Sequence, residues 1–239
     1  MADVQDPQKP QTPRELARTR TIAQIVQLGR EHLALHGAAA LSLRAVARDL
    51  GVVSSAVYRY VESRDELLTL LLIDAYGELG DAVDAAVEPF PADDFRGRFA
   101  ALAHAVREWA LREPSRYSLL FGSPVPGYQA PAERTTGPGT RVVTCLMGIL
   151  DSAYRAGRLA APDAAVVHPA LAADFEAIRG GLDLAVPDAL LARGALVWTS
   201  IFGAVSFEVF GQYGAATFSA PDELFQHHVD MLARVAGFD

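Results

Sequence analysis

The chain has 239 residues, of which 51% are hydrophobic and 21% are charged, and its formal net charge is −8 at pH 7. This composition excludes a largely disordered chain, and the length allows one large domain or two smaller ones. The single cysteine, Cys145, excludes an internal disulfide and favours a reducing, cytoplasmic setting. Residues 1–12 show neither apolar periodicity nor a secretory signal, so we expect a flexible arm there.

Helix-capping signals organise the amino-terminal part of the chain. Thr12 and Glu15 form a capping box around a proline at the first helical position, and Ser63 and Glu66 form a second one. Ser42 is expected to cap a short helix between them. Together with apolar residues at helical spacing, these signals predict helices at about 13–36, 43–50, 54–60 and 64–87.

Helical spacing continues through the rest of the chain without strand-like alternation. A long loop is predicted at 122–139, where glycine and proline recur. The uncharged stretch 194–207 is shorter than the roughly 20 residues needed to cross a bilayer, so we expect a buried helix in a core or at an interface, with no membrane partner. Further helices are expected at about 93–112, 114–121, 140–156, 170–178, 188–212 and 221–235.

The second and third predicted helices and the turn between them have the spacing of a helix-turn-helix, whose second helix enters the DNA major groove. Small residues at 54–56 would allow close approach to base edges, and Val57 is expected to anchor inward. The segment 13–64 carries eight arginines against four acidic residues in a chain that is acidic overall. This asymmetry is a candidate electrostatic footprint for phosphate, with chance as the alternative.

From residue 22 to residue 68 the sequence resembles the TetR family of one-component transcriptional repressors. The motifs that carry the resemblance are LGV at 50–52, VYRYV at 57–61 and RDELL at 64–68. The resemblance implies an all-α fold, with a helix-turn-helix domain at 13–66 and a larger helical ligand-binding and dimerisation domain at 67–239. It also implies a homodimer that reads two half-sites of a double-stranded DNA operator, about 34 Å apart.

The resemblance also implies which side chains contact DNA. Arg44 matches a base-reading position, Tyr58 and Tyr60 match phosphate-contacting positions, and Arg64 matches a basic residue that pairs with phosphate. The alternatives are a solvated Arg44 or Arg59 and a Tyr58 that packs on the first helix. The full predicted set is Ser42, Arg44, Ser54, Ser55, Ala56, Tyr58, Arg59, Tyr60 and Arg64.

Two features around the predicted DNA-binding set leave alternatives open. Val53 stands where many members of the family have a serine or threonine cap for the third helix, so that cap must come from elsewhere. Arg14, Arg18 and Arg20 either support DNA binding from the first helix or form a solvated face.

In the family the second domain binds a small molecule and forms the dimer through two late helices. The stretch 194–214 is apolar on more than one face and carries Gly203, Ala204 and Ser206 for close approach to a partner. The final helix supplies a second apolar stripe. Trp198 followed by Gly203 resembles a WHG-type carboxy-terminal domain, although Phe202 stands where a histidine is frequent.

A small, largely apolar effector of unknown identity would bind between these helices, and ordinary core packing is the alternative for every aromatic residue there. The candidate pocket residues are Trp109, Tyr117, Phe121, Met147, Tyr154, Phe175, Trp198 and Phe202. We expect no catalytic residues, metal site or cofactor, because the enzyme motifs for these are missing from the sequence. The rival functions are a helical small-molecule-binding protein that does not bind an operator and, more remotely, a helical enzyme.

Overall fold

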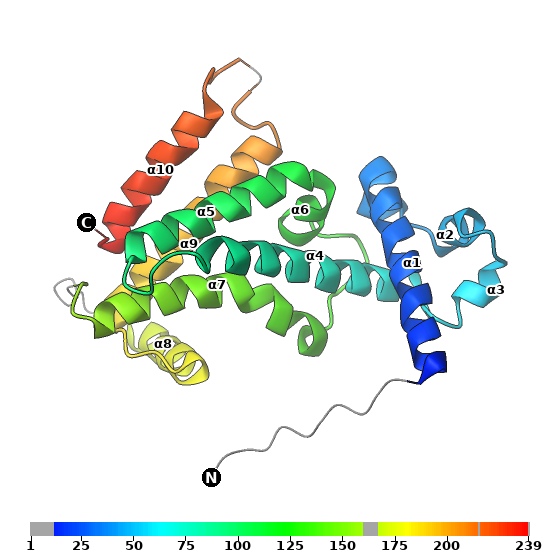
Figure 1. The fold of residues 1–239 in the computed structure, drawn as a ribbon, viewed down its shortest axis with the longest axis horizontal. Coiled ribbons are helices and arrows are strands. Elements are labelled where there is room, and N and C mark those ends of the chain that lie inside the picture. Colours follow the sequence, from blue (N-terminus) through cyan, green and yellow to red (C-terminus); the bar gives the residue numbers. More distant parts are fainter. Residues whose placement is uncertain (1–11, 160–166, 215, 239) are drawn as a thin grey trace, which may run out of the picture. The chain divides into compact units, whose positions relative to one another are not determined.

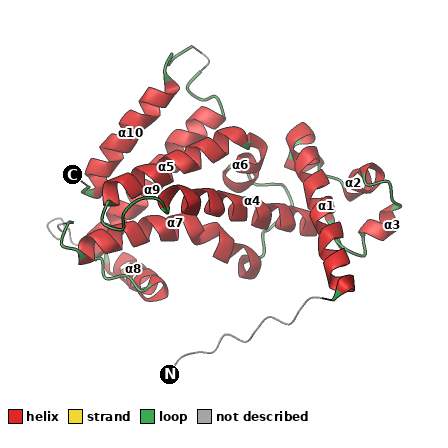
Figure 2. Ribbon diagram, in the orientation of Figure 1, coloured by secondary structure: helices red, strands yellow, loops and turns green. Residues whose placement is uncertain are grey.

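The computed structural model describes residues 12–159, 167–214 and 216–238, and within them the chain forms helices and no strands (Figures 1 and 2). The all-α prediction is therefore confirmed, while the predicted arm, apart from Thr12, lies outside the described residues. In chain order the elements are α1 (Pro13–His36), the 3-10 helix η1 (Ala38–Ala40), α2 (Leu43–Asp49), α3 (Ser54–Val57), α4 (Arg64–Val87), α5 (Phe95–Arg112), α6 (Pro114–Phe121), α7 (Ala132–Arg155), α8 (Pro169–Leu182), α9 (Asp188–Val209) and α10 (Pro221–Ala236).

The capping boxes form largely as predicted. Thr12 Oγ1 accepts from Glu15 N at 3.3 Å and the Glu15 carboxylate accepts from Thr12 N at 2.7 Å, which lowers the pKa of Glu15. Ser63 Oγ accepts from Glu66 N at 3.0 Å. The predicted Ser42 side-chain cap is wrong, because the Ser42 side chain makes no capping hydrogen bond and only its backbone carbonyl accepts, from Val46 N at 3.1 Å.

The chain divides into two compact units. The first runs up to Leu72 and also includes Ser123–Ala130, and the second comprises Ile73–Gly122 and the chain from Pro131 onward. Helix α4 contributes residues to both units, so the division lies inside the helix that the sequence predicts to open the second domain. The first unit packs α1, α2 and α3 around fully buried side chains such as Ile25 and Val46.

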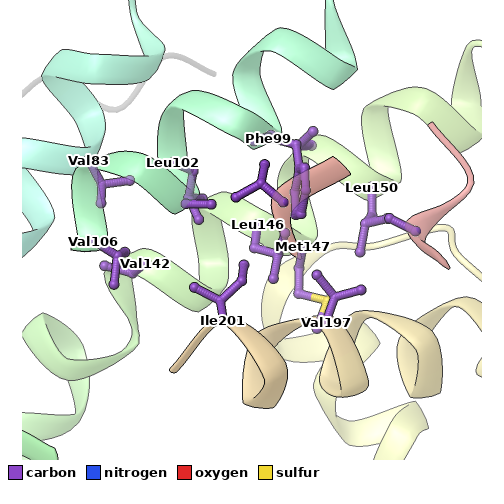
Figure 3. Packing of buried hydrophobic residues seen from close by; sticks show 14 of the residues in the cluster. Val83, Phe99, Leu102, Val106, Val142, Leu146, Met147, Leu150, Val197 and Ile201 are labelled. Atoms are coloured by element: carbon purple, nitrogen blue, oxygen red, sulfur yellow. The ribbon is translucent and has the colours of Figure 1, made fainter. Parts of the chain in front are cut away.

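The core of the second unit joins α5, α7 and α9 with the later turns of α4 (Figure 3). Its fully buried members include Phe99 and Leu102 on α5, Leu146 on α7 and Ile201 on α9. Among the described helices, α9 alone has the length and hydropathy of a membrane span. It packs against α5, α7 and α10 within this unit.

Helix α7 begins earlier than the sequence predicts. Residues 132–139 belong to the helix rather than to a loop, although Pro138 lies inside it and cannot donate to the preceding turn. The Thr140 hydroxyl donates to the carbonyl oxygens of Thr136 and Gly137 at 2.9 and 3.2 Å, and the Tyr76 ring covers Gly139. Side-chain hydrogen bonds and packing therefore stabilise a helix where the local sequence indicates a turn.

Candidate nucleic-acid interface and effector site

A Schellman motif ends α2 and sets the turn of the helix-turn-helix. Val52 N donates to Ala47 O at 3.0 Å and Gly51 N donates to Arg48 O at 3.1 Å, while Gly51 has φ +73°. This left-handed conformation is easy for glycine and costly for residues that carry a Cβ. Gly51 therefore has a definite structural role, namely to turn the chain sharply between α2 and α3.

We expect Gly51→Ala to destabilise the first unit by about 1–2 kcal/mol, the usual cost of a left-handed residue with a Cβ. An added Cβ would meet no atom within 4 Å, so the loss would come from the backbone alone. Hydrogen exchange of the α1–α3 amides measures the effect. Gly51→Asn is the matched control, because asparagine tolerates this conformation and should lose clearly less. Equal losses in both variants would contradict the backbone explanation.

The outward residues of the helix-turn-helix are those with DNA-binding chemistry. Arg44, Ser55, Tyr58 and Arg59 are exposed, while Val57 is buried as predicted. Tyr58 is 43% exposed, so part of its surface is open to a partner. The remaining predicted contact residues are half-buried, namely Ser42, Ser54, Ala56, Tyr60 and Arg64. Helix α3 itself ends at Val57, earlier than predicted, because Tyr60 N closes a tighter turn onto Val57 O at 2.8 Å.

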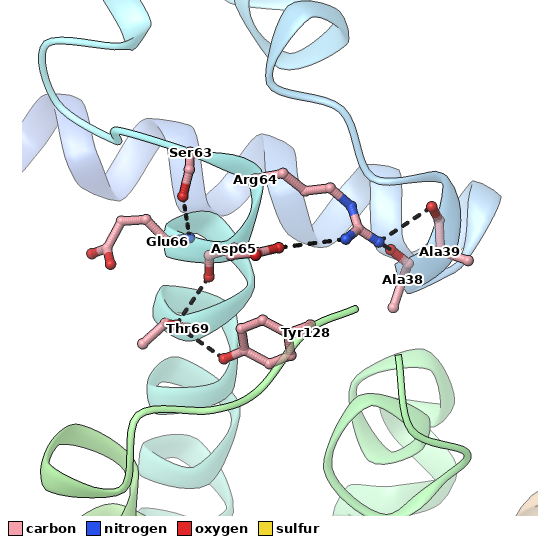
Figure 4. A network of polar contacts seen from close by, with 8 residues as sticks. All are labelled: Ala38, Ala39, Ser63, Arg64, Asp65, Glu66, Thr69 and Tyr128. Atoms are coloured by element: carbon pink, nitrogen blue, oxygen red, sulfur yellow. Dashed lines mark hydrogen bonds and ion pairs between the residues drawn. The ribbon is translucent and has the colours of Figure 1, made fainter. Parts of the chain in front are cut away.

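The side chain of Arg64 contacts the turn between α1 and α2 (Figure 4). Its Nη2 donates to Ala38 O at 3.0 Å and to Ala39 O at 3.3 Å, and its Nη1 lies 3.5 Å from Asp65 Oδ1. In the structure, Arg64 therefore links η1 to the start of α4. Its phosphate contact stays a prediction.

A second polar contact of the first unit has no counterpart in the sequence predictions. His32 on α1 is 8% exposed, and its Nε2 lies 2.6 Å from Asp49 Oδ2 at the end of α2. The hydrogen bond from His32 lowers the pKa of Asp49. The two residues stand 17 positions apart in the sequence, and no local motif marks either of them. This contact stabilises the packing of α2 on α1.

Four of the eight predicted pocket residues form one aromatic cluster between α6 and α9. Ring centroids lie 4.2 Å apart for Trp198 and Phe202, 4.6 Å for Phe202 and Phe121, and 5.0 Å for Phe121 and Tyr117. Phe121 also meets Tyr76 of α4 edge-on at 6.2 Å. The Tyr117 hydroxyl donates to Phe202 O at 3.2 Å and lies 2.8 Å from Ser206 Oγ, and burial raises the pKa of Tyr117 to about 12.

The other four predicted pocket residues lie elsewhere in the second unit. Trp109 is fully buried, donates from Nε1 to Glu78 Oε1 at 3.2 Å and stacks with Arg116. The remaining three are core residues, with Met147 packed against α9, Phe175 buried and Tyr154 half-buried.

Two adjoining hollows, of about 340 and 350 Å³, lie beside α9 and α10. They share Ala204, Tyr213 and His228, and none of the eight predicted pocket residues lines either of them.

A helix-turn-helix unit with an exposed recognition segment, combined with a second unit whose described elements are all helices, defines a DNA-binding transcriptional regulator. The family model described as "Bacterial regulatory proteins, tetR family" matches residues 25–71, and that described as "Tetracyclin repressor-like, C-terminal domain" matches residues 99–232. The chain belongs to the TetR family, which confirms the resemblance found in the sequence.

Several similar proteins are also named as regulators. The HTH-type transcriptional regulators Rv1816 of Mycobacterium tuberculosis and Mb1846 of Mycobacterium bovis are 48% identical over 219 residues, which cover 92% of this chain and 93% of theirs. The crystal structure of the regulatory protein SCO4313 is 34% identical with a TM-score of 0.73, and the match covers 92% of this chain and 98% of that one. A tetR-family protein from Rhodococcus RHA1 shares the fold, with 16% identity, a TM-score of 0.59 and coverage of 90% and 96%.

Proposed function

We propose that this TetR-family regulator is a cytoplasmic homodimeric repressor that binds a palindromic operator and is released from it by a small, largely apolar effector. The observation that carries the proposal is an exposed apolar stripe on the second unit, which would form the interface of a symmetric dimer. Such a dimer would present two recognition helices to two half-sites. The stripe comprises Leu196, Gly203 and Phe207 on α9, Phe210 directly after α9, and Met231 and Val235 on α10.

The spacing and exposure of the stripe residues support a helical dimer interface. On α9 they recur at intervals of seven and four residues, so they share one face of the helix. Leu196 is 56% exposed and Phe207 is 47% exposed. A Cβ added at Gly203 would meet no atom within 4 Å, which leaves room for a partner helix. Two such helix pairs related by a two-fold axis would form a four-helix bundle.

Within each helix-turn-helix we assign Tyr58 and Tyr60 to phosphate contacts and Arg44 to a base edge. The exposure of Tyr58 and Arg44 supports these assignments. Arginine can make a bidentate contact to guanine, which is worth about 1–3 kcal/mol of discrimination, while tyrosine hydroxyls on phosphates add affinity without sequence preference. Ser54 and Ser55 would contribute weakly at the groove.

The aromatic cluster of Tyr117, Phe121, Trp198 and Phe202 is our candidate for the effector-responsive region. It reaches helix α4 through the contact between Phe121 and Tyr76. Beside it, Arg116 of α6 is 3% exposed and donates to Glu78 Oε2 of α4 at 2.7 Å. An effector that separated the rings of α6 and α9 would therefore act on α4, and a coupling of about 1–3 kcal/mol would lower operator affinity about 5- to 150-fold.

A mobility-shift titration on DNA from upstream of the protein's own gene tests this function. We expect nanomolar binding to one near-palindrome, saturation at two chains per site, and release by at least one apolar compound that also raises the melting temperature of the free protein. Arg44→Ala should change the preference at one base pair in each half-site, whereas Tyr58→Phe should weaken binding to all sequences. Compound binding without any operator binding would instead favour the helical small-molecule-binding protein.

A further inference from the structure

The recognition segment of this protein contains only a short helix. Helix α3 has four residues, and its N-cap, Val53, provides no side-chain hydrogen bond. Beyond Val57 the chain continues through Tyr58, Arg59 and Tyr60 before it reaches α4. Carbonyl groups at the end of a helical segment carry partial negative charge and need donors from elsewhere. A hydrogen-bond donor from another helix would therefore set the orientation of Tyr58 and Tyr60.

Arg18 of α1 supplies that donor. Its Nη1 donates to Arg59 O at 3.2 Å, across 41 positions of sequence. The same guanidinium lies over the ring of Tyr60, with its central carbon 5.5 Å from the ring centroid, which is within the range of a cation–π contact. One side chain thus contacts the backbone of one recognition-segment residue and the ring of the next.

We propose that Arg18 is a positioning residue for operator binding, which acts by fixing the segment from Tyr58 to Tyr60 rather than by contacting a phosphate. The proposal rests on the proposed role of Tyr58 and Tyr60 as phosphate contacts. The Arg18 guanidinium is directed at a carbonyl oxygen and at a ring face of its own chain. Its charge therefore stabilises the conformation of the recognition segment. Arg14 and Arg20 are exposed on the same helix and provide matched controls.

The test measures operator affinity as a function of salt for the wild type, Arg18→Ala, Arg14→Ala and Arg20→Ala. A positioning role predicts that Arg18→Ala weakens binding about tenfold while the slope of log K against log salt concentration stays unchanged. A direct phosphate contact would reduce the magnitude of that slope by about 0.9, and this result would overturn the proposal. An operator affinity of Arg18→Ala equal to that of the wild type would also overturn it, in favour of a solvated side chain.

Two further readouts separate positioning from a general loss of stability and from a failure of the proposed function. Hydrogen exchange without DNA should rise in the peptide covering residues 54–61 of Arg18→Ala and stay unchanged in the second unit. In a double-mutant cycle with Tyr60→Leu, the two affinity losses should be less than additive, because both variants release the same contact. If the wild type bound no operator, the exchange experiment would still test whether Arg18 fixes the recognition segment. Unchanged exchange in residues 54–61 would refute that role.

Discussion

Gly203→Arg should convert the protein to a monomer and lower operator affinity about 100-fold or more, because two linked half-site contacts would become independent events. Gly203 is exposed in the middle of the α9 stripe, and a Cβ added there would meet no atom within 4 Å. An arginine there would carry charge and bulk into the proposed helix-to-helix contact between the two copies. Light scattering and the operator titration measure the two effects.

Gly180→Arg is the matched control for this dimer prediction. Gly180 is also an exposed helical glycine with open space around it, but it lies on α8 and outside the stripe. Replacing either glycine raises helix propensity, so neither variant should fold less well. A Gly203→Arg protein that remained dimeric would refute the proposed interface. Loss of the dimer in both variants would show that the surface on α9 is not specific.

Arg107→Ala should destabilise the second unit by about 3 kcal/mol, near the lower end of the range for breaking a buried charge pair. Arg107 is 7% exposed, and its Nε and Nη2 donate to both carboxylate oxygens of Glu208 at 2.7 and 2.6 Å. These hydrogen bonds raise the pKa of Arg107 further above its ordinary value, with a smaller effect from Asp222 at the start of α10. Removing the guanidinium would leave the Glu208 carboxylate, which is 17% exposed, without its partner.

Chemical denaturation followed by tryptophan fluorescence measures this loss, because both tryptophans, Trp109 and Trp198, lie in the second unit. Asp222→Asn is the control, since Asp222 is 85% exposed and its ion pair should contribute less than about 1 kcal/mol. The double variant Arg107→Leu with Glu208→Leu should recover most of the stability, because an apolar pair leaves no unpaired charge. A double variant as unstable as the single one would point to lost packing instead.

The parts of the fold that the sequence predicts well are those with local signals. The capping box of Thr12 and Glu15 involves residues three apart, and Gly51 ends α2 through hydrogen bonds within one turn. Both predictions are confirmed because the hydrogen bonds that stabilise these features involve only a few neighbouring residues. The outward chemistry of the recognition segment is predictable for the same reason, since Val57 anchors a short helix whose other side faces outward.

Features that depend on contacts between residues far apart in the sequence cannot be predicted from local patterns. The predicted start of α7 is wrong because a stretch rich in turn residues becomes helical when Tyr76 covers Gly139 and the Thr140 hydroxyl donates to carbonyl groups near Pro138. The partners of Arg64 lie 25 and 26 positions away, and no sequence pattern links them. Pocket prediction from aromatic residues alone could not show which of them would meet, because that depends on the relative rotation of α6 and α9.

The first unit is built from two separate pieces of chain, since Ser123–Ala130 belongs with the residues up to Leu72. The Thr69 hydroxyl, on a residue that is 3% exposed, donates to Asp65 O at 3.0 Å, so the Tyr128 hydroxyl must donate to Thr69 Oγ1 at 2.9 Å (Figure 4). A chimera that joined this DNA-binding unit to a foreign sensor through α4 alone would leave Tyr128 behind. An exchange of the second unit of this protein would therefore call for two junctions, so that the loop is kept together with the helix.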